Sequence, residues 1–403
     1  MSLFGGKKVL LGVTAGIAAY KSAWLVRLLV KAGAEVQVIM TPSAKEFVTP
    51  LTLSTLSKNP VFSSFTNEED ENAQWNNHVA LGLWADFFII APATANTLSK
   101  MANGTSDNLL LATYLSAKCP VYYAPAMDLD MYKHPTTAAT FQKLDSFGNI
   151  QIAATSGELA SGLIGQGRMA EPEEIIAFIE KDIAQSLPLN GKKILITAGP
   201  TYEAIDPVRF IGNHSSGKMG YSIAEEASKM GAEVTLVSGP VSIELKNDSI
   251  KLISIISAEE MYRAVMNSFN DCDIAIFAAA VADYRPTEVA SEKIKKRDAT
   301  MHIQLEKTTD ILAAVGKIKS NKYLVGFALE TENEVENAKS KLQKKNLDLI
   351  VLNSLKDKGA GFKKDTNKIT LIDKDNNSIP FEVKPKQEVA RDILNFIIKQ
   401  QYA

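Results

Sequence analysis

The sequence predicts an α/β protein with two doubly wound parallel sheets, because the chain opens in the same way twice. Apolar strands that begin near Lys7 and Lys192 each run into a glycine-bearing turn, a helix and a second apolar strand. The two helices end near Gly33 and Gly231, and glycine is common just after a helix. This succession is the first unit of a Rossmann-like sheet. Two such openings therefore predict two sheets.

A boundary between the sheets is expected at residues 186–191, where a helix rich in Glu and Ile gives way to Pro and Gly. We predict a first domain over residues 1–189 and a second over residues 190–403. A chain of 403 residues is also longer than one ordinary compact core, which favours two domains.

The remaining elements follow from apolar runs and helical patterns. In the first domain we expect strands at 35–40, 87–91, 121–124 and 150–153, and helices at 94–102, 107–117, 136–146 and 172–185. In the second domain we expect strands at 233–237, 274–279, 323–328 and 347–352. Two late segments, 368–372 and 379–383, flank a polar turn and predict a β-hairpin.

Composition argues against several classes of protein. Apolar residues make up 46% and charged residues 22% of the chain, which is typical of a globular protein. The net charge of −2 gives no basic excess for nucleic acid, and two cysteines with four histidines do not predict disulfides or structural zinc. Residues 7–20 imitate a signal peptide but fit a strand, turn and helix better, and no run approaches the ~18 apolar residues of a membrane span. We expect a cytoplasmic protein that binds neither nucleic acid nor membrane.

The first glycine turn, Gly12 to Gly16, is not the dinucleotide fingerprint, which requires G-x-G-x-x-G. A helix N-terminus after a strand still offers free amides and a positive dipole to a phosphate. Thr14 and Thr41 would add hydroxyl groups at the carboxyl edge of the sheet. These features suit a mononucleotide such as FMN better than NAD. A tight turn without a ligand is the alternative.

The segment Ala91 to Thr97 follows an apolar strand and supplies small and hydroxyl side chains at its end. Small residues let a flat ring approach the backbone, and Thr94 is placed to cap a helix. The segment therefore favours a ring-binding site, although a simple strand-to-helix turn has the same pattern.

Five motifs in the first half occur together in the order of a known family. They are residues 12–21, 77–78, 91–97, 125–132 and 157–169. The first half resembles the flavin-containing cysteine decarboxylases that act on phosphopantothenoylcysteine. The resemblance implies that FMN oxidises the substrate's thiol side to a thioaldehyde, that CO2 then leaves, and that the product is protonated and reduced. It also implies an FMN site made of Gly12, Thr14, Ala15, Gly16, Thr41, Ala91, Thr94, Ala95, Asn96 and Met127.

The resemblance places His78 as the histidine that takes a proton from the substrate, whereas a lone histidine is more often structural. The family usually has Asn where this chain has Asp128, and Cys where it has Ser161. Asn can donate a hydrogen bond to a carboxylate that an ionised Asp would repel, and a thiol is a better acid than a hydroxyl.

Three interpretations of these departures remain open. Glu158 or a protonated Asp128 replaces the missing acid, Ser161 relays a proton from water, or the decarboxylase half is incomplete. We favour the first, because paired changes inside an otherwise intact framework indicate compensation.

The second half resembles phosphopantothenate–cysteine ligases through residues 197–201, 211–220, 278–285, 293–296 and 326–327. The resemblance implies that CTP activates the phosphopantothenate carboxylate as an acyl-cytidylate, with release of pyrophosphate, and that the cysteine amine then attacks. Lysines and Mg²⁺ are what such chemistry requires.

The resemblance gives roles to particular residues of the second half. Lys293 would steady the charge of the α-phosphate, and Asn213 would hold the acyl-cytidylate or the substrate carboxyl group. The CTP site would comprise Phe277, Ala278, Ala279, Asp283, Lys293, Thr309, Asp310, Ile311, Leu312, Phe327, Lys341 and Lys345. Taken singly, the lysines are more often solvated surface charges, and the segment from Asn213 to Gly217 also fits a helix cap with its turn. No side-chain metal ligands are predicted; Mg²⁺ is expected to arrive with CTP.

Together the two resemblances imply a bifunctional enzyme that makes 4′-phosphopantetheine from 4′-phosphopantothenate, cysteine and CTP. They also imply a homo-oligomer in which the flavin domain forms trimers and the ligase domain forms dimers. Two alternatives are a ligase joined to an altered or inactive flavoprotein, and a nucleotide-binding regulatory protein without turnover.

Overall fold

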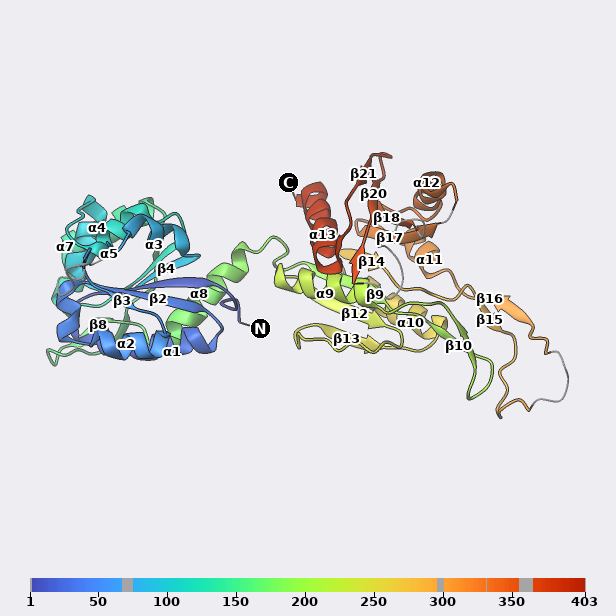
Figure 1. Ribbon diagram of the computed structural model, residues 1–403, viewed down its shortest axis with the longest axis horizontal. Helices are drawn as coiled ribbons and strands as arrows, with labels where there is room; N and C mark the ends of the chain where they lie inside the picture. The colour runs from blue at the N-terminus through green and yellow to red at the C-terminus, as the bar shows by residue number, and fades with distance from the viewer. Residues whose placement is uncertain (1, 67–74, 296–300, 331, 355–364, 403) are drawn as a thin grey trace. The chain divides into compact units, whose positions relative to one another are not determined.

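The computed structural model describes residues 2–66, 75–295, 301–330, 332–354 and 365–402. The chain forms two compact units, Met1–Gln185 and Ser186–Ala403, and each contains its own sheet (Figure 1). The predicted two-sheet α/β fold is confirmed. The basic run 293–296 ends at Lys296, which lies outside the described residues.

The sheet of the first unit has six parallel strands in the order β3-β2-β1-β4-β5-β6. Its strands are β1 (Lys8–Val13), β2 (Glu35–Met40), β3 (Val61–Phe62), β4 (Phe87–Ala93), β5 (Val121–Pro125) and β6 (Ile150–Gln151). Strands are added on both sides of β1, which is the doubly wound arrangement that the sequence predicts.

Helices cover both faces of this sheet, so its central strands are apolar on both sides. Alternate strand residues point to opposite faces: Leu11 packs with α1, α2 and α8, and Leu10 packs with α4, α5 and α7 (Figure 1). The helical elements are η1 (Ile17–Tyr20), α1 (Lys21–Lys31), η2 (Pro42–Glu46), α2 (Pro50–Ser57), α3 (His78–Trp84), α4 (Ala95–Asn103), α5 (Leu109–Ser116), α6 (Leu129–Lys133), α7 (Pro135–Ser146) and α8 (Pro172–Ser186). Strands β7 (Thr155–Glu158) and β8 (Ile164–Arg168) form a separate antiparallel hairpin.

The sheet of the second unit has eight strands in the order β13-β12-β9-β14-β17-β18-β20-β21. Its strands are β9 (Lys193–Ala198), β12 (Glu233–Ser238), β13 (Lys251–Ser254), β14 (Ile274–Phe277), β17 (Tyr323–Glu330), β18 (Leu349–Ser354), β20 (Thr370–Asp373) and β21 (Ser378–Pro380). The first six strands in this order are parallel, and β20 joins β18 antiparallel. Strands β20 and β21 form the predicted hairpin, with its boundaries shifted by a few residues.

The helices of the second unit also lie on both faces of the sheet. They are α9 (Lys218–Lys229), α10 (Ala258–Phe269), α11 (Ile311–Lys317), α12 (Glu334–Lys344) and α13 (Lys386–Tyr402). Helices α9 and α13 share one core with the sheet, and α10, α11 and α12 share the other. Three small pairs that the sequence did not predict are β10 (Tyr202–Ala204) with β11 (Phe210–Gly212), β15 (Tyr284–Pro286) with β16 (Leu305–Lys307), and β19 (Thr366–Asn367) with β22 (Lys384–Pro385).

Two predicted strands are shorter than expected. Strand β14 ends at Phe277 rather than at Ala279, and β6 ends at Gln151. In both places an apolar residue follows the strand, so composition alone did not mark its end.

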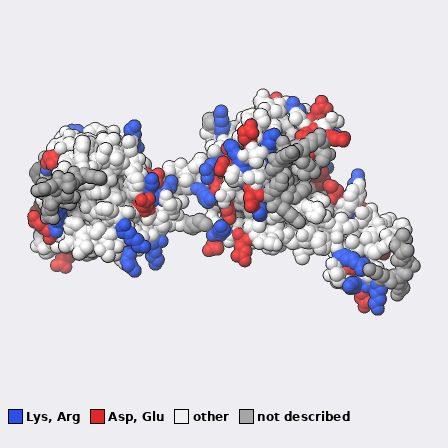
Figure 2. Space-filling model, viewed as in Figure 1, with Lys and Arg blue, Asp and Glu red and all other residues white. Residues whose placement is uncertain are grey.

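Charges of both signs are mixed over the face of the described residues seen in Figure 2, and no continuous basic area is visible on it. Among the helices that the structure describes, none is both long enough and apolar enough to cross a membrane.

Candidate functional site

A cavity of about 920 Å³ lies at the carboxyl edge of the first sheet, where doubly wound folds bind their ligands. Residues that follow β1, β2, β4 and β5 line it, and the hairpin β7–β8 adds a further wall. A cavity of this size holds a ligand as large as a mononucleotide.

Seven of the ten predicted cofactor residues line this cavity. They are Ala15, Gly16, Thr41, Thr94, Ala95, Asn96 and Met127. Gly12, Thr14 and Ala91 do not line it. Gly12 lies within β1, where a Cβ atom would come within 3.1 Å of Leu110 and Phe88, so its glycine serves packing below the cavity.

The prediction of a free hydroxyl at Thr14 is not met by the geometry. Its Oγ1 donates to the Pro92 carbonyl at 2.8 Å and accepts from the Thr94 amide at 3.1 Å, and the side chain is fully buried. Thr14 therefore ties the β1 turn to the end of β4. Thr94 occupies the N-cap position of α4 but forms no capping hydrogen bond; its hydroxyl donates to that of Thr97 at 3.4 Å.

Unlike Thr14, Thr41 has a hydroxyl group that is available to a ligand. It lines the cavity, and its buried Oγ1 has no hydrogen-bond partner among the described residues. A buried hydroxyl without a partner is costly, so its position indicates that a bound group completes it.

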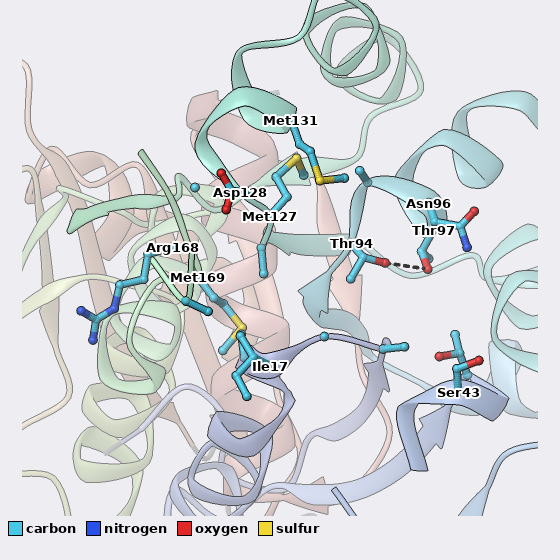
Figure 3. A pocket seen from close by; sticks show the side chains of 18 of the residues that line it. Ile17, Ser43, Thr94, Asn96, Thr97, Met127, Asp128, Met131, Arg168 and Met169 are labelled. Atoms are coloured by element: carbon cyan, nitrogen blue, oxygen red, sulfur yellow. Dashed lines mark hydrogen bonds between the residues drawn. The ribbon is translucent and has the colours of Figure 1, made fainter. Parts of the chain in front are cut away.

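The cavity has two chemically different sides (Figure 3). Ser43, Thr94 and Asn96 offer neutral polar groups on one side. Asp128 and Arg168 lie on the other, together with the methionines Met127, Met131 and Met169. A polar end and a reactive end of a ligand could therefore be held apart.

The cations that line the cavity are all engaged by carboxylates. Lys21 is nearly buried and contacts Glu171 at 2.9 Å, Arg168 contacts the same Glu171 at 2.8 Å, and Lys100 pairs with Asp107. The hydrogen bond from Lys21, assisted by the charge of Arg168, lowers the pKa of Glu171. These cations hold the walls of the cavity together.

The carboxylates of Asp128 and Glu158 line the same cavity without a partner. Neither side chain forms an ion pair or a hydrogen bond with another described residue. Glu158 is exposed at the end of β7, and Asp128 is half-buried. Both are thus placed to act on a bound molecule.

His78 and Ser161 lie outside the cavity of their own chain. His78 begins α3, its ring packs against Phe65 and Trp75, and its buried Nδ1 has no partner among the described residues. Ser161 is exposed between β7 and β8, and its Oγ accepts from the Leu163 amide at 3.5 Å.

The hairpin β7–β8 is anchored to the cavity through Gly167. Its carbonyl accepts from the Met127 amide at 3.0 Å, and its φ is +145°. A Cβ atom here would lie 2.4 Å from the Met127 carbonyl oxygen. Only glycine lets the two backbones approach this closely, and this contact sets the position of Glu158.

Two adjoining cavities occupy the corresponding edge of the second sheet. One, of about 580 Å³, includes Asn213 and the N-terminus of α9; the other, of about 470 Å³, includes the N-terminus of α11. They share the residues Ala279, Val281, Asp283, Phe327 and Lys341. Two ligands bound in them would meet at this common wall.

Most of the predicted CTP residues line the smaller cavity. They are Phe277, Ala279, Asp283, Thr309, Asp310, Ile311, Leu312, Phe327, Lys341 and Lys345. Ala278 lines the larger cavity, and the exposed Lys293 lines neither. Asn213 lines the larger cavity, where its Nδ2 donates to the Val281 carbonyl at 2.8 Å. It is therefore not the helix cap that the sequence also allowed.

Lys341 and Lys345 face the smaller cavity from the end of α12. Burial lowers the pKa of Lys341, and the charge of Lys345 lowers it further. Lys341 donates to the Phe327 carbonyl at 2.7 Å, and Lys345 pairs with Asp310 at 2.9 Å. Burial alone would raise the pKa of Asp310, but the Ala313 amide and Lys345 lower it. An anion in this cavity would relieve the repulsion between the lysines.

The larger cavity receives two lysines that the sequence analysis did not single out. Lys218 begins α9 and pairs with Asp365, and Lys386 begins α13 and is nearly buried. Burial and the neighbouring Lys218 lower the pKa of Lys386. The N-termini of two helices and two lysines, one of them paired with Asp365, thus meet at this cavity and favour an anion there.

Some residues that line the first cavity were not predicted from the sequence, and they differ in whether a sequence signal was present. Lys21, Arg168 and Met169 lie inside motifs that carry the resemblance, so their positions could have been proposed. Lys100 and Asp107 are brought to the cavity by helix packing, which leaves no local pattern. No group of three or more metal-ligating side chains occurs in the part of the chain that the structure describes.

Comparison with known proteins gives two family matches that cover the two halves. Residues 3–184 match the family described as "Flavoprotein", and residues 189–401 match the "DNA/pantothenate metabolism flavoprotein C-terminal domain".

Relatives of known name match along nearly the whole chain. The coenzyme A biosynthesis bifunctional protein CoaBC of Bacillus subtilis is 45% identical over 98% of this chain and 97% of its own length. A cysteine/cysteine sulfinic acid decarboxylase from an unknown prokaryotic organism is 57% identical over 87% of this chain and 99% of its own length. A crystal structure of the C-terminal domain of a CoaBC protein is 44% identical over 53% of this chain and 98% of its own, with a TM-score of 0.46. The chain belongs to the family of coenzyme A biosynthesis bifunctional proteins, with a flavoprotein domain followed by a pantothenate-metabolism domain.

Proposed function

We propose that the chain is a bifunctional enzyme which ligates cysteine to 4′-phosphopantothenate at the expense of CTP and then decarboxylates the product to 4′-phosphopantetheine. The observation that carries the proposal is the separation of the sites. One cavity lies at the rim of the flavoprotein sheet, and two adjoining cavities lie at the rim of the second sheet. Membership in the bifunctional family supports the same division of labour.

For the ligase, the smaller cavity suits CTP and the larger suits phosphopantothenate. Lys341 and Lys345 would neutralise the triphosphate, and Lys218 and Lys386 would receive the phosphate of the second substrate. The substrate carboxylate would then attack the α-phosphate at the shared wall, near Asn213, and release pyrophosphate. The cysteine amine next attacks the acyl carbon and releases CMP.

Mg²⁺ would be held mainly by the triphosphate. Among the described residues, Asp283 and Asp310 are the carboxylates that line the smaller cavity. Asp310 already pairs with Lys345, which leaves Asp283 to contact the cation or its waters.

For the decarboxylase, FMN fits the first cavity. The hydroxyl of Thr41 lacks a partner, and the neutral groups of Ser43 and Asn96 suit the phosphate and ribityl chain. When bound, the flavin supplies a two-electron oxidation of the substrate thiol and the return of those electrons. The side with Asp128 and Glu158 is where a substrate would lose CO2 and be protonated. The name of the relative that is 57% identical, a cysteine/cysteine sulfinic acid decarboxylase, also states the decarboxylation of a cysteine-type compound.

His78 and Lys293 line none of these three cavities of their own chain. Their roles therefore depend on a homo-oligomer, trimeric through the flavin domain and dimeric through the ligase domain, in which each meets the site of a neighbouring copy. Ser161 would act only if the hairpin tip closes on a bound substrate.

The ligase is tested by measuring pyrophosphate release by the purified chain. We expect sustained release only when CTP, phosphopantothenate, cysteine and Mg²⁺ are all present, and no more than one equivalent per site when cysteine alone is left out. Release with CTP alone, or none with the full set, contradicts the assignment.

The decarboxylase is tested by flavin absorbance and by CO2 release from synthetic phosphopantothenoylcysteine. We expect a yellow protein and one CO2 per phosphopantetheine formed. Glu158→Gln should slow turnover after CO2 loss, and wild-type turnover in this variant would remove Glu158 from the mechanism. A colourless protein that still releases pyrophosphate would leave only the ligase.

A further inference from the structure

Asp128 occupies an unusual position on the wall of the flavin cavity. It is the N-cap residue of α6, where an aspartate normally accepts a hydrogen bond from a helix amide, yet its side chain accepts none. Figure 3 shows it beside Met127 and Met131 on one side of the cavity. Its carboxylate therefore faces bound ligands without a partner among the described residues.

The surrounding charges do not neutralise this carboxylate. Lys21 and Arg168 both contact Glu171, and Lys100 contacts Asp107. Glu158 adds a second carboxylate without a partner to the lining. This part of the cavity is thus negative, so it attracts an ammonium group more strongly than an uncharged amide.

We infer, on the basis of the proposed decarboxylase, that Asp128 binds the α-ammonium group of a substrate and lets the flavin domain accept free cysteine besides phosphopantothenoylcysteine. The cysteine nitrogen is an uncharged amide in phosphopantothenoylcysteine and an ammonium group in free cysteine. A carboxylate at residue 128 stabilises only the second. Asp128 is in this way a specificity residue that favours the free amino acid.

The reaction of free cysteine balances without an outside oxidant. The bond from Cα to the carboxylate breaks, CO2 leaves, and the electron pair remains on Cα and takes up one proton. Cysteine and one proton thus give cysteamine in its ammonium form and CO2. The two electrons withdrawn from the thiol side return in the same turnover.

The inference is tested by binding of cysteamine, the cationic product, and N-acetylcysteamine, its neutral analogue, to the flavin-loaded full chain by calorimetry. In Asp128→Asn the Kd of cysteamine should rise about tenfold or more, because a charge-assisted contact is lost. The Kd of N-acetylcysteamine should stay within about twofold. An unchanged Kd for cysteamine, or equal changes for both compounds, would overturn the inference.

Two further variants locate the effect. Asp130→Asn removes a charge from the same short helix at an exposed residue that does not line the cavity, and it should leave both Kd values unchanged. Glu158→Gln tests the second carboxylate. If cysteamine binding falls in Glu158→Gln and not in Asp128→Asn, the ammonium site is at Glu158 and the inference is wrong.

Turnover gives an independent measurement. The ratio of CO2 release from free cysteine to that from phosphopantothenoylcysteine should fall about tenfold in Asp128→Asn. An unchanged ratio contradicts the role of Asp128. Release from neither substrate by the wild type would instead contradict the proposed decarboxylase, and the cysteamine comparison would still test the ammonium site.

Discussion

The two units open with the same strand, turn and helix, but they offer different groups to a phosphorylated ligand. In the flavin unit the neutral hydroxyl of Thr41 lacks a partner, while each lining cation is engaged by a carboxylate. In the second unit the half-buried Lys341 forms no ion pair with a described residue and has a lowered pKa. The shared opening therefore does not determine how a phosphate is bound.

This difference between neutral groups and lysines fits what we propose for the two ligands, since one stays bound and the other is cleaved. A flavin that stays bound and returns to its starting oxidation state can be held by a cavity of matching shape and by neutral hydrogen-bond donors. A triphosphate that is cleaved develops charge on the leaving pyrophosphate, and nearby lysines stabilise it. These lysines come from the last turn and the C-cap of α12, far along the chain from the glycine turn.

The largest effect is expected from Lys341→Met, which should lower ligase kcat/KM by about several hundredfold. The variant loses the positive charge that would stabilise the triphosphate as it is cleaved. CO2 release by the flavin domain should not change. Pyrophosphate and CO2 assays on the same preparation measure both. Lys344→Met is the matched control, since Lys344 is exposed on the same helix and lines neither cavity. Equal losses of ligase activity in the two variants would mean that the net positive charge of the helix is responsible, not the position of Lys341.

A second large effect is expected in the flavin unit from Gly167→Ala. The new Cβ atom would clash with the Met127 carbonyl, which should displace the hairpin and lower CO2 release about fiftyfold. Gly162→Ala is the control, because Gly162 also has a positive φ but meets nothing within 4 Å. Pyrophosphate release should be normal in both variants. If both variants lose CO2 release equally, backbone strain in the hairpin is responsible, not the close approach at Gly167.

The sequence predicted the parts of this architecture that depend on local patterns. Apolar runs between glycine turns gave the two parallel sheets, and the polar turn near residue 375 gave the hairpin β20–β21. It also placed Thr41 and Asn96 at the cavity, because residues just after parallel strands gather at one edge.

The sequence did not predict contacts between residues that lie far apart along the chain. Thr14 bonds to Pro92, and Lys21 pairs with Glu171 about 150 positions away. Neither pairing leaves a periodic or compositional signal, so the sequence alone predicts a ligand contact for Thr14 and no role for Lys21. The half-buried His78 and the exposed Lys293 line none of the three cavities, and no motif of the sequence indicates this.

A smaller effect is expected from Thr41→Val, which keeps the shape of the side chain and removes the hydroxyl. FMN affinity should fall about tenfold if Thr41 donates to the phosphate. The flavin-free protein should be as stable as the wild type or slightly more stable, because a buried hydroxyl without a partner is gone. Flavin titration and thermal unfolding without flavin measure the two quantities. A loss of stability without a loss of affinity would assign Thr41 to the fold alone.

The smallest effect concerns the protonation of Lys341. Burial and Lys345 lower its pKa in the free protein, and a bound triphosphate should raise the pKa again because negative charge stabilises the ammonium form. Binding of CTP at about pH 9 should therefore take up protons, whereas binding at about pH 7 should take up fewer, since the lysine is then largely protonated beforehand. Calorimetry in buffers of different ionisation enthalpy measures this uptake. The proton uptake should disappear in Lys341→Met and persist in Lys344→Met. Uptake that survives in Lys341→Met would mean that another group titrates. The second unit would then bind phosphates through neutral groups, much as the first unit does.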